Sequence, residues 1–260
     1  MSNIKLTMIT VLLAVMMLLV SASVFAAGEL KSYIQKDDGA FDYSLEKIQL
    51  YNNRQVSVST FNMTSQVWQG EEWKHTVQIY YPAQCTMKGT ALLLVTGGNV
   101  AKDKTSTLVQ ACTALSAPVV ILYNIPNQPL FEKNEDALIA YTFANAAKED
   151  DFSEWPLLLP MVKSTVKAMD LVEEFTKDNF NSAVSQFIVA GASKRGWTTW
   201  LSAGIDDARV SGIAPLVFDF LKFPEQLAHE MECYGVLSDQ LGDYSDINIH
   251  LGGETVQKKT

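Results

Sequence analysis

The sequence predicts an α/β fold, in which a mainly parallel sheet carries helices on both of its faces and follows an N-terminal antiparallel hairpin. Two observations lead to this prediction. From residue 90 onward, short and wholly apolar segments alternate with segments of helical periodicity. Ahead of them lie two strand-like segments joined by a glycine turn. Repeated strand–helix units place their strands in parallel and pack their helices against the sheet.

The hairpin is predicted over residues 55–68 and 72–81. Both segments are rich in Val, Thr, Ile, Tyr and Trp, the residue types that strands favour. Gly70 lies in the turn between them, where glycine tolerates a positive φ. His75 falls on the second strand, on a face of alternating apolar residues, and we interpret it as a packing residue rather than a catalytic one.

Strand–helix alternation is expected after the hairpin. Asn134 is a candidate N-cap because two acidic residues follow it in the first helical turn. In the longest predicted helix, Lys163 falls among the charged side chains away from the apolar face. Gly204 suits the end of the last helix. The predicted strands are residues 91–95, 118–123, 186–190 and 210–217, and the predicted helices are residues 103–115, 134–148, 158–175 and 197–203.

The composition argues against several classes of function. The 260 residues are 48% hydrophobic and 19% charged, as in an ordinary folded chain. The net charge of −9 disfavours a nucleic-acid partner, because binding to phosphates requires an excess of positive charge. Cys85, Cys112 and Cys233 are widely spaced and form no CxxC or Cys/His cluster. We therefore expect no metal or other cofactor, and at most one disulfide.

Residues 1–26 have the pattern of a secretory signal peptide. Lys5 precedes an apolar run over residues 8–20, and Val24 and Ala26 suit positions −3 and −1 of a cleavage site. Cleavage would give a periplasmic or secreted protein without a stable membrane span. The alternative is a retained membrane anchor, because the run is near the lower length limit for a span.

Ser193 is the main candidate for chemistry, because it lies in the turn between the strand predicted at residues 186–190 and a helix. In a nucleophile elbow a tight turn raises the serine hydroxyl above the sheet, and the residue two positions earlier must be small. Gly191 meets that requirement. Arg195 takes the usual place of the second glycine in G-x-S-x-G, and Gly196 follows one position later. The alternative is an ordinary turn in which Ser193 caps the helix.

Two backbone segments are candidate oxyanion donors, the groups that bind the negative oxygen of a tetrahedral intermediate. The N–H of Lys194 begins the helix after the serine, where backbone dipoles favour negative charge. Gly98 and Asn99 follow the first parallel strand, where such folds place the second donor. The alternative for this second segment is an ordinary loop.

The two cations after the serine have two interpretations. The side chains of Lys194 and Arg195 either contact an acidic substrate or pair internally with acids such as Glu135 and Asp136. For Arg195 we favour the internal pairing.

Several segments of the sequence form a recognisable series. The clearest is Gly191–Leu201, which contains the serine turn and two tryptophans. The others are Asn127–Leu130, Glu135–Thr142, Pro160–Lys163, Ala168–Asp170, Pro215–Asp219 and Tyr234–Gly235. Together, from about Ile48 to about Asp246, they resemble the PhoPQ-activated pathogenicity-related protein family in the same order.

The resemblance implies an α/β-hydrolase fold and an exported, mostly bacterial protein regulated by a two-component system. It implies no particular substrate, so a small molecule or a peptide stays open. By position, Ser193 corresponds to the family's nucleophile, with Gly98 and Lys194 near the oxyanion site. Family members look longer, so we expect a fold that is incomplete at its C-terminus. The expected organisation is a signal peptide (1–26), an N-terminal segment (27–47), a partial hydrolase domain (48–246) and a divergent tail (247–260).

A complete catalytic triad is not expected. In α/β-hydrolases the acid and the histidine follow the serine along the chain. Only His250 follows acids in that order, after Asp239, Asp243 and Asp246, and its segment lacks a strand pattern. His229 falls in a predicted helix as a surface or packing residue. The unfinished sheet is expected to present an apolar edge.

Three functional hypotheses follow. The first, which we favour, is an exported serine hydrolase by ancestry, acting on ester or amide bonds, whose truncated chain is weakly active or inactive. The second is a non-catalytic envelope-stress protein that binds a partner or a cationic peptide through its acidic surface. The third is a gene remnant that does not fold stably.

Overall fold

The computed structural model describes residues 28–100, 102–149, 154–180, 183–206, 208–218, 223–236 and 238–245. The chain divides into two compact units, Met1–Lys36 and Asp37–Thr260. Residues 28–35 of the first unit are helical. The segments predicted as signal peptide and divergent tail lie outside the described residues. Of the helices that are described, none has the length and apolar character needed to cross a membrane.

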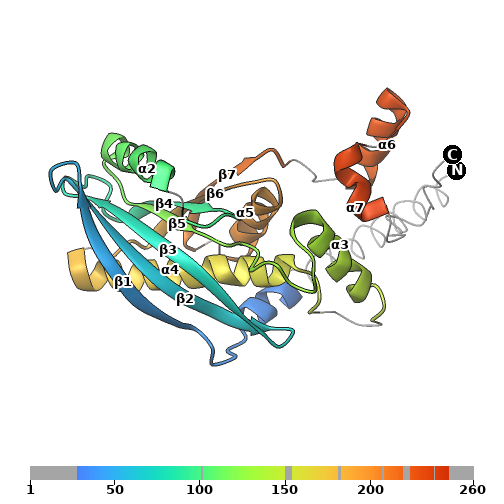
Figure 1. Cartoon of the computed structure of the whole chain (residues 1–260), viewed down its shortest axis with the longest axis horizontal. Coiled ribbons are helices and arrows are strands. Elements are labelled where there is room, and N and C mark those ends of the chain that lie inside the picture. The colour runs from blue at the N-terminus through green and yellow to red at the C-terminus, as the bar shows by residue number, and fades with distance from the viewer. Residues whose placement is uncertain are drawn as a thin grey trace, which may run out of the picture. The chain divides into compact units, whose positions relative to one another are not determined.

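A seven-stranded mixed sheet organises the second unit, with the strand order β1-β2-β3-β5-β4-β6-β7 (Figure 1). The pairs β1–β2, β2–β3 and β3–β5 are antiparallel, whereas β5, β4, β6 and β7 run parallel to one another. This arrangement confirms the predicted α/β class and the hairpin ahead of the parallel strands. The strands are β1 (Asp42–Tyr51), β2 (Val56–Trp68), β3 (Glu71–Pro82), β4 (Thr90–Val95), β5 (Val119–Leu122), β6 (Gln186–Ala192) and β7 (Val210–Leu216).

Helices pack on both faces of this sheet (Figure 1). On one face, Val58 of β2 belongs to a cluster with α2. On the other, Phe61 of β2 makes an edge-to-face contact with Phe175 of α4 at 4.9 Å between ring centroids. The odd spacing between Val58 and Phe61 puts them on opposite sides of the strand. The helices are α2 (Lys102–Leu115), α3 (Glu135–Ala146), α4 (Leu158–Phe180), α5 (Lys194–Ile205), α6 (Phe223–Tyr234), the 3₁₀ turn η1 (Asp239–Leu241) and α7 (Gly242–Ser245).

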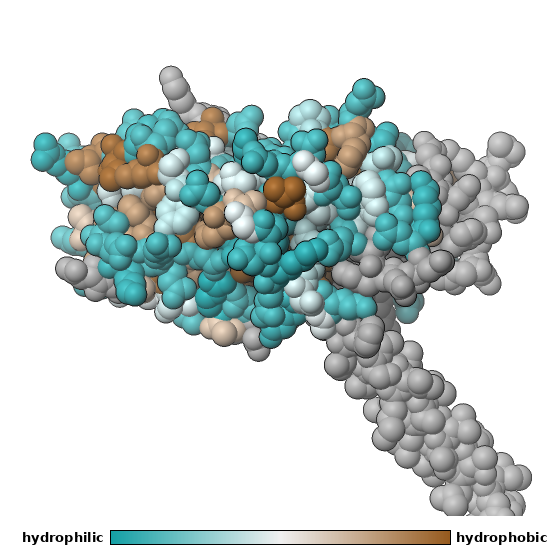
Figure 2. Space-filling model, turned by 90° about the horizontal axis from the view of Figure 1, so that it is seen from below, coloured by the Kyte–Doolittle hydropathy of each residue, from teal (hydrophilic) through white to brown (hydrophobic). Residues whose placement is uncertain are grey.

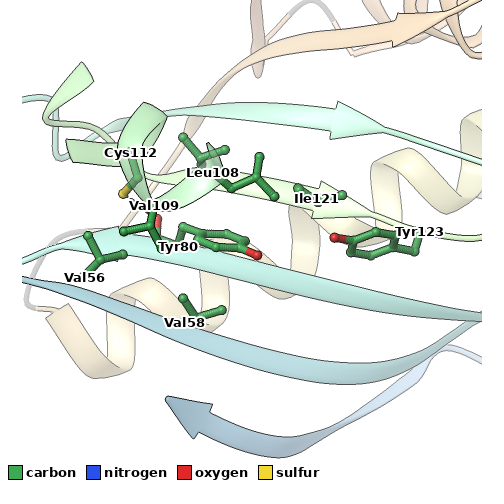
Figure 3. Packing of buried hydrophobic residues seen from close by; sticks show 9 residues of the cluster. Val56, Val58, Tyr80, Leu108, Val109, Cys112, Ile121 and Tyr123 are labelled. Carbon is green, nitrogen blue, oxygen red and sulfur yellow. Dashed lines mark hydrogen bonds between the residues drawn. The ribbon is translucent and has the colours of Figure 1, made fainter. Parts of the chain in front are cut away.

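The cluster under α2 includes two tyrosines whose hydroxyls find partners within the core. The hydroxyl of Tyr80 donates to Oε1 of Gln78 at 3.0 Å, and that of Tyr123 donates to the same oxygen at 3.1 Å. Both hydroxyls are therefore satisfied away from water, as buried polar groups require. The buried members of the cluster are Val56, Val58, Tyr80, Leu108, Val109, Cys112, Val119, Ile121 and Tyr123 (Figure 3).

The edge strand β1 was not predicted from the sequence. Its register shifts between Leu45 and Lys47, and such an irregularity interrupts the alternation by which a strand is identified. Leu45, Ile48 and Leu50 are about half exposed on this strand. Apolar residues also gather toward one end of the mainly hydrophilic face in Figure 2. Strand β1 therefore covers β2 while leaving part of its own apolar surface in contact with solvent.

The prediction that Lys163 lies away from the buried face of its helix is wrong. Lys163 is only 3% exposed, and its Nζ lies 3.1 Å from Oδ2 of Asp38, ahead of β1. Burial alone would raise the pKa of Asp38, but hydrogen bonds from the Ala40 backbone and from Lys163 lower it overall. The lysine is buried because the middle of α4 is enclosed on nearly all sides, and a buried ammonium requires an anionic partner.

Two predicted helix ends also differ from the structure. Asn134 has the extended backbone of an N-cap, yet its side chain makes no capping hydrogen bond. Gln128 acts in its place, since its Oε1 accepts the backbone N–H of Glu135 at 2.9 Å. Gly204 lies within α5, which ends at Ile205. At the start of α3, the capping group is therefore supplied from outside the helix, by Gln128 in the loop that leaves β5.

Candidate active site

Ser193 lies between β6 and α5 with a backbone conformation that serine rarely adopts. Its φ is 56° and its ψ is −125°, in a region that costs conformational energy for residues other than glycine. Its N–H donates to the carbonyl of Leu216 on β7 at 2.9 Å. Ser193 is exposed, whereas Gly191 before it is buried. The turn therefore presents the serine at the carboxyl edge of the parallel strands.

The two glycines around Ser193 allow β6, α5 and β7 to approach closely. A Cβ on Gly191 would lie 2.5 Å from the carbonyl oxygen of Arg195. A Cβ on Gly196 would lie 2.9 Å from Cβ of Phe218 and 3.1 Å from the carbonyl oxygen of Leu216. These distances are below ordinary contact, so neither position accommodates a side chain. Gly196 thus permits the close helix–sheet packing although it stands one position later than in G-x-S-x-G.

Arg195 links the serine turn to the loop after β4. A Cβ on Gly97 would lie only 1.7 Å from Nη2 of Arg195, so the guanidinium occupies the space above that glycine. Its Nε also donates to the carbonyl of Ile125, after β5. The side chain of Arg195, which follows β6, therefore contacts the segments that follow the neighbouring strands β4 and β5. This contact requires both an arginine at 195 and a glycine at 97.

The segments predicted to supply oxyanion donors lie at neighbouring strand ends. Val95 of β4 pairs with Gly191 of β6, so the loop with Gly98 and Asn99 starts beside the serine turn. Lys194 begins α5, and the N–H groups of a first helical turn have no partner within the helix. The carbonyl of Gly98 accepts the N–H of Asn124 at 3.1 Å, and both Gly98 and Asn99 are exposed. The roles of these residues as donors stay predictions.

Both cations after the serine pair internally. Arg195 binds Glu135 through two parallel hydrogen bonds of 2.8 and 2.7 Å. The ammonium of Lys194 contacts Glu135 and also lies 3.3 Å from Oδ2 of Asp136. Burial alone would raise the pKa of Glu135, but hydrogen bonds from Arg195, Lys194 and Gln128 hold it at about 2. Glu135 therefore stays ionised at neutral pH and neutralises the cations beside it.

The two described histidines contact groups other than Ser193. In the buried His75 side chain, Nε2 lies 3.1 Å from Oγ of Ser65 and Nδ1 lies 3.1 Å from the carbonyl oxygen of Asn124. Burial lowers its pKa to about 4, so the ring is neutral at pH 7. His229 is exposed on α6, with Nε2 3.6 Å from Sγ of Cys233. The packing interpretation of His75 and the helical position of His229 therefore agree with the structure.

Within the part of the chain that the structure describes, the remaining candidates from the sequence form no second site. Asp239 and Asp243 are exposed in η1 and α7, whereas Asp219, Asp246 and His250 lie outside the described residues. Among the residues that the structure describes, no group of three or more His, Cys, Asp or Glu side chains is placed to hold a metal ion. The three cysteines are free thiols.

Sequence reasoning missed two residues that contact the acids of this cluster. Gln128 binds Glu135 through both its amide nitrogen and its amide oxygen. Tyr244 of α7 donates its hydroxyl to Oδ1 of Asp136 at 3.0 Å, and burial raises the pKa of that hydroxyl. The first contact joins residues seven positions apart in the chain, and the second joins residues 108 positions apart. The only earlier signal was that Gln128 lies in one of the matching family segments.

A mixed sheet covered by helices on both faces, with a strained serine turn at the carboxyl edge, defines a protein of the α/β-hydrolase type. The chain belongs to the PhoPQ-activated pathogenicity-related protein family, whose model matches residues 30–259.

A relative and two solved structures illustrate these likenesses. Autocrine proliferation repressor protein A of Dictyostelium discoideum is 34% identical over 255 residues, which cover 90% of this chain and 49% of that protein. The chain thus spans about half the length of this curated relative. Acetyl xylan esterase 1 of Thermoanaerobacterium matches with a TM-score of 0.50 at 13% identity. The match covers 85% of this chain and 71% of the esterase chain. A glucuronoyl esterase of Solibacter usitatus matches with a TM-score of 0.48 at 10% identity. That match covers 85% of this chain and 66% of the esterase chain. At 13% identity, the likeness to the acetyl xylan esterase concerns the fold alone.

Proposed function

We propose that the protein is a serine hydrolase of the ester-cleaving kind and that Ser193 is its nucleophile. The observation that carries the proposal is the backbone of Ser193, held at φ 56° and ψ −125° at the N-terminus of α5. A strained and exposed serine at this point of the fold matches a nucleophile elbow. The side-chain oxygen of a simple helix cap would be expected to accept a hydrogen bond from a backbone N–H of the first turn, and that of Ser193 accepts none.

The proposed reaction is acyl transfer. Oγ of Ser193 attacks the carbonyl carbon of an ester, and its proton passes to a base. The tetrahedral oxyanion accepts hydrogen bonds from the N–H of Lys194 and from the N–H of Gly98 or Asn99. The bond to the alcohol oxygen then breaks, and the alcohol leaves with a proton. Water attacks the acyl-serine in a second step, which releases the carboxylic acid and restores the serine.

We infer that the 260-residue chain catalyses this reaction weakly. Both described histidines are engaged elsewhere, His75 in the core and His229 on α6. Because neither of these two described histidines serves as the base, we infer that the proton of Ser193 passes to solvent. An oxyanion site and substrate binding alone retain a residual part of the catalysis of a full triad. The acylation of Ser193 is therefore the step to measure, because it needs no turnover.

The test is acylation by an activated ester followed by intact-mass and peptide analysis. We expect 4-nitrophenyl acetate to place one acetyl group on the peptide that contains Ser193. In Ser193→Ala the acylation rate should fall by at least about 100-fold. Ser211→Ala, an exposed serine on the neighbouring strand β7, should acylate like the parent chain. Acylation that continues unchanged in a folded Ser193→Ala variant would remove Ser193 as the nucleophile.

We also propose export with cleavage after Ala26. The support is the sequence pattern of residues 1–26, an apolar run followed by a small residue at the cleavage position. Expressed from its full coding sequence in a bacterial host, the protein should be recovered from the periplasm or medium. Its first residue by N-terminal sequencing should be Ala27. Recovery of the intact chain in the membrane fraction would instead support the retained anchor.

A further inference from the structure

The charges beside Ser193 balance in number but not in exposure. Lys194 and Arg195 contribute two positive charges, and Glu135 and Asp136 contribute two negative ones. The cation side chains are 6% and 10% exposed, whereas those of Glu135 and Asp136 are 43% and 34% exposed. The positive members are therefore covered, and the members that meet solvent are the carboxylates. An incoming molecule would meet a negative surface although the cluster is neutral overall.

These carboxylates lie close enough to Ser193 to act on a bound acyl group. Lys194 is the next residue after Ser193, and its ammonium contacts both Glu135 and Asp136. The length of one lysine side chain limits the separation of the carboxylates from the serine to on the order of 10 Å, slightly more than the Debye length of about 8 Å at physiological salt. At low salt, where the Debye length is longer than this separation, charges at a protein surface influence one another measurably.

Further contacts keep the carboxylates in this arrangement. Gln128 and Arg195 bind Glu135, and Tyr244 donates to Asp136 at 3.0 Å. The nearby cation Lys133 points its ammonium toward the ring of Tyr141, 5.7 Å from the ring centroid. The negative charges at the site thus have fixed positions.

We propose that this site selects neutral acyl groups over negatively charged ones, and that the exposed carboxylates of Glu135 and Asp136 set the preference. The inference rests on the proposed function, because it concerns the ester that Ser193 attacks. A carboxylate-bearing acyl group would meet two like charges and no accessible cation from Lys194 or Arg195. A neutral acyl group would not meet this repulsion. The substrate class is therefore an ester of an uncharged acid.

The test compares two esters with the same six-carbon acyl chain, the 4-nitrophenyl ester of adipic acid and that of its monomethyl ester, in which a methyl ester replaces the free carboxylate. Both have the same acyl length, and at neutral pH only the first carries a free carboxylate. The second-order rate constant for acylation of Ser193 is measured for each by intact mass. The ratio of the two rate constants is divided by the ratio measured for hydrolysis of the same esters by hydroxide, which removes the difference in their intrinsic reactivity. At low salt we expect the neutral ester to react about fivefold faster, and we expect the difference to shrink as salt is added.

Variants identify the groups responsible. Asp136→Asn removes one exposed charge and leaves the Arg195–Glu135 pair in place, so the ratio should fall by about twofold. Glu46→Gln is the matched control, because it removes the same charge from an exposed pair with Lys47 on the far edge strand β1. Its ratio should equal that of the parent chain. Thermal unfolding of each variant verifies that the chain remains folded.

The outcomes separate this inference from the proposed function. If neither ester acylates Ser193 in the folded chain, the proposed function fails. If both acylate it but the charged ester reacts as fast or faster, the selectivity is wrong and the nucleophile stands. The proposed selectivity is also wrong, and the nucleophile again stands, if Asp136→Asn leaves the salt-sensitive preference for the neutral ester unchanged. A faster neutral ester whose advantage falls in Asp136→Asn and not in Glu46→Gln supports the inference.

Discussion

Gly191→Ala is expected to destabilise the protein by about 3 kcal/mol, the upper end of the range of about 1–3 kcal/mol that overpacking typically costs. The added Cβ would lie 2.5 Å from the carbonyl oxygen of Arg195 and 2.7 Å from its carbonyl carbon. Both are backbone atoms of α5, so no side-chain rotation relieves the contact. The helix must move away from β6, which also displaces the serine turn. Urea unfolding of the parent and the variant measures the loss.

Gly204→Ala is the control for this substitution. It lies in the same helix, is exposed, and its added Cβ would meet no heavy atom within 4 Å. Because alanine is the better helix former, this variant should be more stable than the parent by about 0.5–1 kcal/mol. Opposite signs for the two variants would identify packing at the elbow as the cause. A Gly191→Ala variant as stable as the parent would contradict the close approach of α5 and β6.

Glu135→Ala is expected to cost about 2–3 kcal/mol, less than a fully buried ion pair because the carboxylate is 43% exposed. The substitution leaves the covered guanidinium of Arg195 without its two carboxylate bonds. It also removes an anionic partner of Lys194. The control is Glu72→Ala, whose pair with Lys74 at 2.7 Å is more than half exposed on both sides. That variant should lose less than about 1 kcal/mol.

The same carboxylate should make stability depend on pH. Burial would raise its pKa, but the bonds from Arg195 and Lys194 lower it from 4.5 to about 2 in the folded chain. The unfolded chain therefore takes up the proton first as the pH falls. The stabilisation is complete above about pH 4.5 and is lost as the pH approaches 2. In Glu135→Ala, the slope of unfolding free energy against pH in this window should be smaller, and an unchanged slope would contradict the assignment.

Local patterns were sufficient to predict most of the architecture. The hairpin, the parallel strands and α4 follow from periodicity, and these elements are confirmed with boundaries shifted by a few residues. The position of Ser193 between a buried strand and a helix was equally visible. In each case the signal lies within a short stretch of sequence, where alternation or helical spacing records which side is buried.

What the sequence did not reveal depends on contacts between elements, which the periodicity of a single element does not record. Lys163 looked like a surface residue because helical spacing cannot show that Asp38 meets it inside the fold. Gln128 replaced Asn134 as the source of the capping group because the loop after β5 returns to the start of α3. From the sequence, the position of Gly196 was recognised only as a difference from the G-x-S-x-G pattern. Its packing against Phe218 explains why the later position serves.

The ion pair between Asp38 and Lys163 has a consequence for how the molecule opens. Edge strands usually fray independently of the core, with small free energies of local unfolding. Here the residue just ahead of β1 holds a buried ammonium in the middle of α4, 125 residues away. Peeling back the start of this edge would leave the ammonium without that carboxylate inside the protein, at a cost far above that of ordinary fraying. The entry to β1 is therefore coupled to the central helix and should detach only when the sheet itself comes apart.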